Sequence, residues 1–302
     1  MSTIPSAAGA QAEDAPASGL APAGCGVRAF GIVRAGPDAL AALRLRPCPP
    51  DVGHFRPNFL KHSDEQTVAG LAAVLDAIRR FGLRDQDFTA WGVVAAPRWL
   101  GRPKAAAAIS KFHREGVPGA SPMVVPHLSL HAVSGTISQA LHLHGPNFGV
   151  GSGPGNVGEG LLTAVAVVAE GSLPGLWLVL TQWDPEPSPD ELGRVSPPAV
   201  CYAVALALVP VPVDQSGPCL RIVLPTPPPH PLPEAERGSQ TTVSPPLRFG
   251  EGVGGGDSPA SVGGLAEFLE DRSPSVTWVC PLPWGGRVEL NGRPRLPGET
   301  QP

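Results

Sequence analysis

Residues His144 to Leu161 read HGPNFGVGSGPGNVGEGL, and this segment constrains the fold more than any other part of the chain. A short extended piece around Phe148 enters a glycine-rich turn, and an apolar helix is expected after Asn156. Such a turn places a residue at a helix N-terminus, where free N–H groups and the helix dipole favour negative charge. Enzymes use turns of this kind to hold nucleophiles and oxyanions, so the segment is the first candidate site.

Strand and helix patterns precede this segment. Strands are expected at residues 27–34 and 88–96, and short helices at 104–113 and, with weaker propensity, 125–142. The best helix begins near Ser63, where Ser63 and Gln66 have the spacing of a capping box, and it ends at Gly82.

The alternation continues after the segment. A helix is expected at 161–170, strands at 176–181, 200–209 and 220–224, a short helix near 265–269, and a hairpin from 275–280 and 287–290. Strands that alternate with helices favour an α/β fold with a mixed, mostly parallel sheet covered by helices.

Composition divides the chain into four parts. Residues 1–25 are rich in Ala, Pro, Ser and Gly and are expected to be a disordered leader, and 26–224 form the domain. Residues 225–262 form a Pro/Gly-rich irregular segment, and 263–302 a tail that packs on the domain. The PPPHPLP run could dock an SH3-type or WW-type groove, although a stiff spacer is the simpler interpretation.

Charge and hydropathy exclude several classes of protein. The net charge of −4 provides no basic surface for nucleic acid. The longest apolar run, Ala199 to Val209, is too short to span a bilayer. The five cysteines show no zinc-ligand spacing and are expected to be reduced thiols of a cytoplasmic protein; they are Cys25, Cys48, Cys201, Cys219 and Cys280. No metal or other cofactor is implied.

The residues before the glycine-rich turn resemble the β-ketoacyl synthase family. These synthases carry a helix of the type N-x-V-A-G-R-I-S, then L-x-L-x-G-P, then a strand that ends in T-A-C-S-S. Here His131 to Ser138 read HAVSGTIS and Leu141 to Pro146 read LHLHGP. The resemblance covers about residues 26–224, close to the N-terminal half of a synthase, and is strongest to divergent domains of the chain-length-factor type. It implies half of a thiolase-like fold.

The same resemblance places Pro154 at the position of the nucleophilic cysteine, in a remodelled elbow that comprises Ser152, Gly153, Pro154, Gly155 and Asn156. Proline has neither a thiol nor a backbone N–H for an oxyanion hole, although it suits the first turn of a helix. The family's histidine motifs of the C-terminal half do not follow. By resemblance, His131 and Phe148 could border an acyl pocket, and Asn147 to Gly151 could pair across a dimer interface.

Other interpretations of these residues are open. Ser152 could act as a nucleophile, but the G-x-S-x-G pattern is incomplete. Gly153, Gly155 and Gly158 match a dinucleotide fingerprint with Asp184 after the next strand, which would indicate a nucleotide-binding enzyme.

Several histidines and one acid are weaker candidates. His127 and His131 would share a helix face as zinc ligands can, whereas His142 and His144 cannot, and surface histidines are the simpler interpretation. Glu159 is expected to be a surface or interface carboxylate.

The resemblance therefore predicts a β-ketoacyl-synthase-like protein of fatty-acid, polyketide or polyene biosynthesis that does not condense. It would be the partner, or chain-length-factor-like subunit, of a true ketosynthase in a homo- or heterodimer, and could bind an acyl chain or an acyl carrier protein. A nucleotide-binding enzyme and a degenerate structural module are the alternatives.

Overall fold

The computed structural model describes residues 24–45, 55–56, 58–119, 124–151, 153–188, 190, 199–210, 217–225, 260–271 and 277–298. The expected leader (1–25) and the expected irregular segment (225–262) lie largely outside these ranges.

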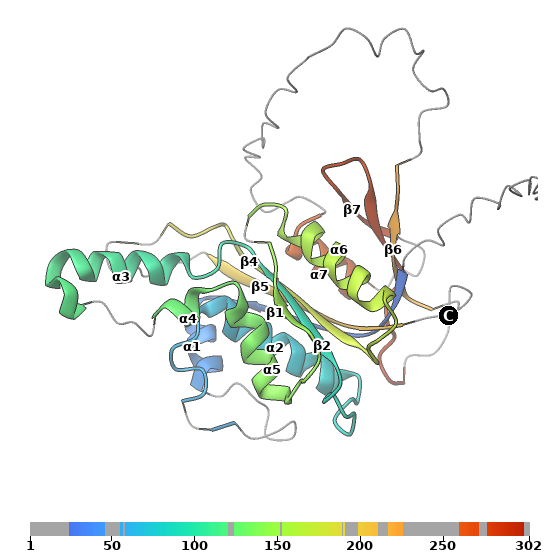
Figure 1. Ribbon diagram of the computed structural model, residues 1–302, viewed down its shortest axis with the longest axis horizontal. Helices are drawn as coiled ribbons and strands as arrows, with labels where there is room; N and C mark the ends of the chain where they lie inside the picture. The colour runs from blue at the N-terminus through green and yellow to red at the C-terminus, as the bar shows by residue number, and fades with distance from the viewer. Residues whose placement is uncertain are drawn as a thin grey trace, which may run out of the picture.

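A mixed sheet of eight strands runs through the centre of the described residues, in the order β3-β2-β4-β5-β1-β6-β8-β7 (Figure 1). The strands are β1 Gly24–Ala35, β2 Gly92–Pro97, β3 Asn147–Gly149, β4 Leu176–Asp184, β5 Val200–Val209, β6 Cys219–Val223, β7 Thr277–Pro281 and β8 Arg287–Asn291. Helices cover it, as the sequence predicted: α1 Pro37–Leu45, α2 Glu65–Arg80, α3 Arg102–Glu115, α4 Val124–Leu128, α5 His131–Leu141, α6 Asn156–Ala169 and α7 Val262–Glu270, with a 3₁₀ turn η1 at Val117–Gly119.

The expectation of a mostly parallel sheet is wrong. Only two of the seven pairings between the described strands are parallel, those of β2 with β3 and with β4, and the other five are antiparallel. Parallel neighbours need a long crossover, usually a helix. Helices α3 to α5 connect β2 to β3, and α6 connects β3 to β4, whereas the described residues between β4 and β5 contain no helix. Strand–helix alternation therefore holds only in the middle of the chain.

Each face of the sheet has its own hydrophobic core. Helices α2 and α5 pack on one face, and α6 and α7 pack on the other (Figure 1). Helix α2 lies very close to β1, because a Cβ added to Gly31 would fall 1.9 Å from the carbonyl oxygen of Ala73. Only glycine fits at that contact.

Several element boundaries differ from the sequence prediction. Residues 88–91 form a turn in which the Trp91 amide donates to the Phe88 carbonyl, so β2 begins only at Gly92. The expected helix at 125–142 is broken between α4 and α5, where the Ser129 hydroxyl donates to the Pro126 carbonyl. Such a side-chain bond competes with continuation of the helix. Helix α1 had not been predicted.

The predicted capping box at the start of α2 is also wrong. Asp64 is the N-cap, and its side chain accepts a hydrogen bond from the Gln66 amide at 2.8 Å. The Gln66 side chain points inward, where it donates to the Arg98 carbonyl and accepts from the Thr181 hydroxyl, each at 2.8 Å. The Gln66 side chain thus makes buried hydrogen bonds at the end of the sheet in place of the capping hydrogen bond that the sequence pattern predicts.

The C-terminal residues continue the main sheet. Strand β8 pairs with β6, and β7 pairs with β8 at the edge opposite β3. Trp278, Cys280 and Leu282 from this hairpin join the core formed with α6. In the described part of the chain, no helix is long and apolar enough to cross a membrane.

Candidate functional site

The glycine-rich segment folds as a strand, a turn and a helix. Strand β3 lies at the edge of the sheet beside β2, and the Val150 amide donates to the Ala95 carbonyl, which extends the contact by one residue. The chain then turns at Gly151, whose φ of +72° favours glycine. Helix α6 starts at Asn156, with Gly155 as its cap residue.

Pro154 lies exposed in this turn, just before the cap residue of α6. It precedes the first helical residue, Asn156, by two positions. Gly153 and Gly155 flank it, and an added Cβ on Gly153 would meet nothing within 4 Å. Ser152 lies outside the described residues. None of Gly153, Pro154 and Gly155 carries a nucleophilic side chain.

Asn156 anchors the elbow to the sheet. Its buried side-chain Nδ2 donates to the carbonyl oxygens of Ala96, at 2.8 Å, and of Thr181, at 3.4 Å. These carbonyls belong to the carboxyl-terminal parts of β2 and β4, so one amide holds the start of α6 over two strands. This contact gives Asn156 a structural role.

A cysteine lies near the first turn of α6, although it comes from the other end of the chain. The Sγ of Cys280, on β7, is 3.7 Å from the position of a Cβ added to Gly158. Burial raises the pKa of Cys280 to about 11, so the thiol is protonated near neutral pH and is a poor nucleophile. The described part of the chain has three further cysteines, on β1, β5 and β6.

His131 and Phe148, the expected border of an acyl pocket, are brought near each other. His131 begins α5, and a Cβ added to Gly149, next to Phe148, would lie 2.8 Å from the His131 amide nitrogen. Both side chains are exposed, and the Nδ1 of His131 is 3.4 Å from the Ser134 hydroxyl. The backbones therefore meet, while the two side chains face solvent.

The histidine pair that could have shared a helix face does not do so. His127 is on α4 and His131 on α5, because the predicted single helix is broken between them. The His127 ring instead lies 5.9 Å from that of His62. His142 and His144, at the end of α5 and beyond it, are exposed. Among the described residues, no group of three or more histidine, cysteine or acidic side chains could hold a metal ion.

The topology does not favour dinucleotide binding by Gly153, Gly155 and Gly158. In the dinucleotide fold the strand before the glycines belongs to the interior of the sheet. Here that strand is the three-residue edge strand β3, and β2 separates it from the next strand, β4. Asp184 ends β4, and Glu159 is exposed on α6.

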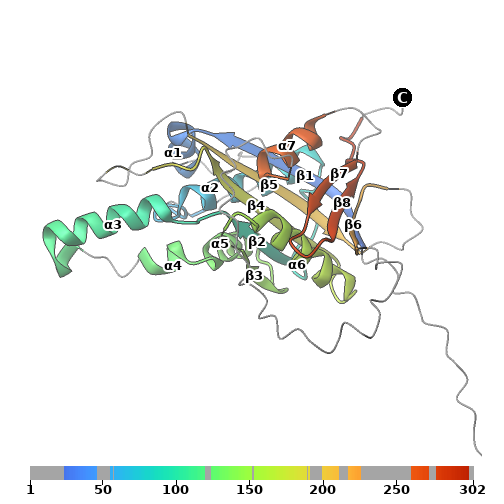
Figure 2. The ribbon, with the colours of Figure 1, turned by 90° about the horizontal axis from the view of Figure 1, so that it is seen from above.

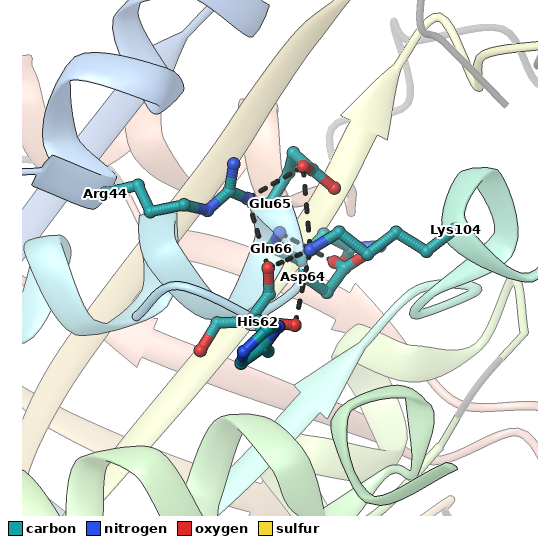
Figure 3. Close-up of polar contacts among 7 residues, drawn as sticks. Arg44, His62, Asp64, Glu65, Gln66 and Lys104 are labelled. Atoms are coloured by element: carbon teal, nitrogen blue, oxygen red, sulfur yellow. Dashed lines mark hydrogen bonds and ion pairs between the residues drawn. The ribbon is translucent and has the colours of Figure 1, made fainter. Parts of the chain in front are cut away.

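A second group of residues, which the sequence did not indicate as a site, lies at the same end of the sheet. We call Arg44, Asp64, Glu65, Gln66 and Lys104 the polar cluster (Figure 3). Arg44 of α1 and Lys104 of α3 approach Glu65 Oε1 from two sides, at 2.8 and 3.9 Å. Both cations also donate to the Ser63 carbonyl.

Asp64 is the most buried acid of the polar cluster. Its Oδ1 accepts from the Gln66 amide, while its Oδ2 is buried without a hydrogen-bond partner. Burial, and then the neighbouring negative charge of Glu65, raises the pKa of Asp64 to about 7. Burial also lowers the pKa of Lys104. The polar cluster therefore contains a carboxyl that is largely protonated at mildly acidic pH.

A charged group lies beside the polar cluster, at the ends of β2 and β4. The guanidinium groups of Arg98 and Arg102 lie 4.4 and 5.1 Å from the ring centre of Trp99, whose φ of +50° is unusual for a bulky residue. Arg102 is 3.8 Å from Glu186. Burial raises the pKa of Glu186 to about 7, although Arg102 and Arg98 oppose the shift.

Thr181 connects the elbow with the polar cluster. Its carbonyl accepts from the Asn156 side chain and from the Arg98 amide, and its hydroxyl donates to Gln66. The run Ser63-Asp64-Glu65-Gln66 contains three residues of the polar cluster, but the same run is also typical of a helix N-cap. The sequence alone therefore does not indicate the polar cluster. The charged partners are far apart in the chain, so no motif brings them together.

No protein-family model matches the chain, and no curated protein matches its sequence. Solved structures that resemble it are ketosynthases and chain length factors, the family that the residue pattern resembles. A type II polyketide synthase complex of an acyl-carrier protein with its ketosynthase matches with a TM-score of 0.42 and 14% identity, over 62% of each chain. The ishigamide ketosynthase/chain length factor matches with a TM-score of 0.43 and 14% identity, over 66% of each chain.

A ketosynthase (ApeO) in complex with its chain length factor (ApeC) from Xenorhabdus doucetiae matches with a TM-score of 0.44 and 12% identity, over 66% of this chain and 60% of that chain. The match thus spans less than two thirds of each of these three chains. The similarity describes the general fold and identifies no site, substrate or partner.

Proposed function

We propose that this chain is a β-ketoacyl-synthase-like pseudoenzyme of fatty-acid, polyketide or polyene biosynthesis, and that it serves as partner or chain-length-factor-like subunit of an active ketosynthase. One observation carries the proposal. The elbow that the sequence resemblance aligns with the family's nucleophile has Pro154, exposed and in front of the helix cap, at the nucleophile position.

The chemistry of condensation explains why this position matters. A synthase forms a thioester on a thiolate, and Pro154 offers no nucleophile. Proline also lacks the N–H that would stabilise an oxyanion, and loss of one such donor typically raises the barrier by about 3 kcal/mol. Cys280 does not replace the missing thiol, because it is buried and its pKa is raised.

Strand β3 is the surface that we propose for the partner. It pairs with β2 on one side and has no neighbouring strand on the other among the described residues. An open strand edge can pair with another chain. The Phe148 side chain is 44% exposed there, and the Oδ1 of Asn147 is buried without a hydrogen bond. Residues 147–151 would thus pair with the same strand of a ketosynthase or of a second copy.

A loading assay tests the proposed lack of condensation chemistry. The full chain is incubated with acyl-carrier protein that bears a mass-tagged acyl thioester, and the intact mass is measured. We expect no acyl adduct on the wild-type chain. Gain of an adduct by Pro154→Cys would indicate that the acyl pocket is otherwise complete. A covalent adduct on the wild-type chain would contradict the proposal.

Two matched variants locate any adduct that forms. Cys280→Ser removes the thiol near α6, whereas Cys219→Ser removes a more accessible thiol elsewhere in the sheet. An adduct that is lost only in Cys280→Ser would identify Cys280 as an unexpected nucleophile, and the chain would then be an enzyme.

Co-purification tests the proposed partnership. The tagged chain is expressed in its native host, and the bound proteins are identified by mass spectrometry. We expect a ketosynthase or an acyl carrier protein in stoichiometric amount, and loss of the ketosynthase in Phe148→Glu. Isolation of the chain as a monomer without either protein would favour the degenerate structural module.

Thermal denaturation with added nucleotide tests the nucleotide-binding alternative. A ligand at 100 times its Kd adds about 2.7 kcal/mol to the free energy of unfolding, which thermal denaturation detects. We expect no shift of Tm with NAD or NADP at millimolar concentration. A shift that disappears when Gly155 is replaced by valine would favour the nucleotide-binding enzyme over our proposal.

A further inference from the structure

The β7–β8 hairpin, in red in Figure 2, ends the sheet on the side away from β3. Strand β7 pairs with β8 and has no strand on its other side among the described residues. Trp278 and Cys280 of β7 are buried in the core with α6. Thr277, Val279 and Pro281 are exposed on the opposite face. Strand β7 is therefore an open edge of the described sheet, with one face in solvent.

The backbone groups of β7 divide between β8 and the open edge. At the hairpin turn the Leu282 amide donates to the Gly286 carbonyl at 2.8 Å, so Leu282 directs its backbone toward the β8 side. In an antiparallel pair this direction alternates from one residue to the next. The backbone groups of Thr277, Val279 and Pro281 therefore face the open edge. They offer two amides and three carbonyls, because proline has no N–H.

The open edge lacks the charges that usually protect an exposed strand. Natural edge strands are often blunted by charged side chains, especially lysine. Residues 273–286 contain no Asp, Glu, Lys, Arg or His, in a chain in which 16% of the residues are charged. On the neighbouring strand β8, the Nε of Arg287 is 2.7 Å from the Oε1 of Glu289, so these two charges neutralise each other. A second copy of the same edge would therefore meet no like charge on β7.

We propose that β7 pairs antiparallel with β7 of a second copy of this chain, about a twofold axis at Val279. In this register the Val279 amide of each copy donates to the Val279 carbonyl of the other copy. The Thr277 amide of each copy donates to the Pro281 carbonyl of the other. Every amide on the open edge then has an acceptor, and the missing N–H of Pro281 leaves only the Thr277 carbonyl without a partner.

The β7 contact is independent of the proposed function, because β3, where we propose that a ketosynthase binds, is the opposite edge of the sheet. Stable interfaces bury about 1,200 Å² or more in total, and one short strand pair provides less. We therefore expect a reversible equilibrium between monomer and dimer rather than a permanent dimer. A complex with a ketosynthase on β3 would then contain two copies of each chain.

Sedimentation velocity of the full chain, from low micromolar to several hundred micromolar, tests this proposal. We expect the average mass to rise with concentration from that of a monomer toward that of a dimer. Val279→Lys places two like charges at the axis and should weaken the dimer by about tenfold or more. Val279 is 38% exposed, so lysine fits the folded monomer, which circular dichroism checks. A chain that stays monomeric at every concentration would overturn the proposal.

Matched variants locate the contact. Leu224→Lys adds the same charge to an exposed apolar residue just after β6, two strands from the open edge, and should leave the dimer unchanged. Val279→Cys should form a disulfide-linked dimer on mild oxidation, because the Cα atoms of a hydrogen-bonded antiparallel pair lie about 5.5 Å apart, whereas Leu224→Cys should not.

Phe148→Glu, on β3, separates the two edges and should leave the dimer intact. If Phe148→Glu abolishes the dimer and Val279→Lys does not, the two copies pair through β3 and the inference about β7 is wrong. A dimer that depends on Val279, without any ketosynthase in the co-purification, would support the β7 contact and count against the proposed function alone.

Discussion

Replacement of Asn156 by aspartate tests whether the side-chain amide of Asn156 holds the elbow against the sheet. The change conserves shape, but a carboxylate presents two acceptors to the carbonyl oxygens of Ala96 and Thr181, which now accept from the amide Nδ2. The site is buried, so water cannot replace the lost donor. We expect Asn156→Asp to be folded but strongly destabilised.

The magnitude follows from the contacts. Two hydrogen bonds are lost, at about 1 kcal/mol each, and an unpaired carboxylate is buried, at about 3 to 5 kcal/mol. The N-terminus of α6 offsets the charge by up to about 2 kcal/mol. The net loss in the free energy of unfolding should be about 3 to 5 kcal/mol at pH 8. It should decrease at pH 5, because the introduced carboxyl group can donate one hydrogen bond once it is protonated.

Urea denaturation at pH 8 and pH 5, followed by tryptophan fluorescence, measures both values. Trp91, Trp177 and Trp183 are buried and report loss of the core. Gln139→Glu makes the same amide-to-carboxylate change at an exposed position of α5 and should be nearly neutral. If Asn156→Asp is within about 0.5 kcal/mol of wild type at pH 8, which is the usual range of surface changes, Asn156 does not anchor the elbow.

Three further changes test other parts of the molecule. Asp64→Asn should become increasingly stabilising relative to wild type as the pH rises from 5 to 7, by about 2 kcal/mol in all, because the folded wild-type chain must retain a proton that its unfolded state has released. Urea titrations at both pH values measure this difference, and a difference that does not change with pH would contradict the prediction. Gly31→Ala should yield little folded protein on circular dichroism, because the added Cβ meets α2 backbone, whereas Gly36→Ala, with its nearest contact at 4.0 Å, should fold normally. Cys25, whose pKa burial raises to about 12, should react with a thiol reagent only after denaturation, and rapid labelling in the native state would show that β1 is more open than its contacts imply.

Most of the central fold could be predicted from the sequence because it follows local patterns. The apolar period of α2 and the continuous apolar run of β5 identify their elements directly. Strand direction could not be predicted in the same way. It depends on which strands become neighbours, as when β1 inserts between β5 and β6 from the beginning of the chain.

The candidate site could be predicted only where its residues are consecutive. Gly151, Gly155 and Asn156 lie in one run, and the expected strand, turn and helix are present there. The polar cluster joins α1, α2 and α3, so its composition depends on the tertiary fold. The pattern at Ser63 to Gln66 predicted only local hydrogen bonds, and it assigned Gln66 to the wrong partner.

The buried polar side chains are not spread evenly through the core. Among the described residues, seven of the eight lie at the starts of α2 and α6 and near the end of β4: Ser63, Asp64, Gln66, Thr67, Asn156, Thr181 and Gln182. Burial of a polar group costs free energy unless its partners are held in place, so apolar residues would stabilise the same core more simply. In open α/β sheets, ligands bind beyond the carboxyl ends of the parallel strands. The concentration of costly polar contacts at the carboxyl ends of β2 and β4 therefore argues that the chain maintains the geometry of this end of the sheet.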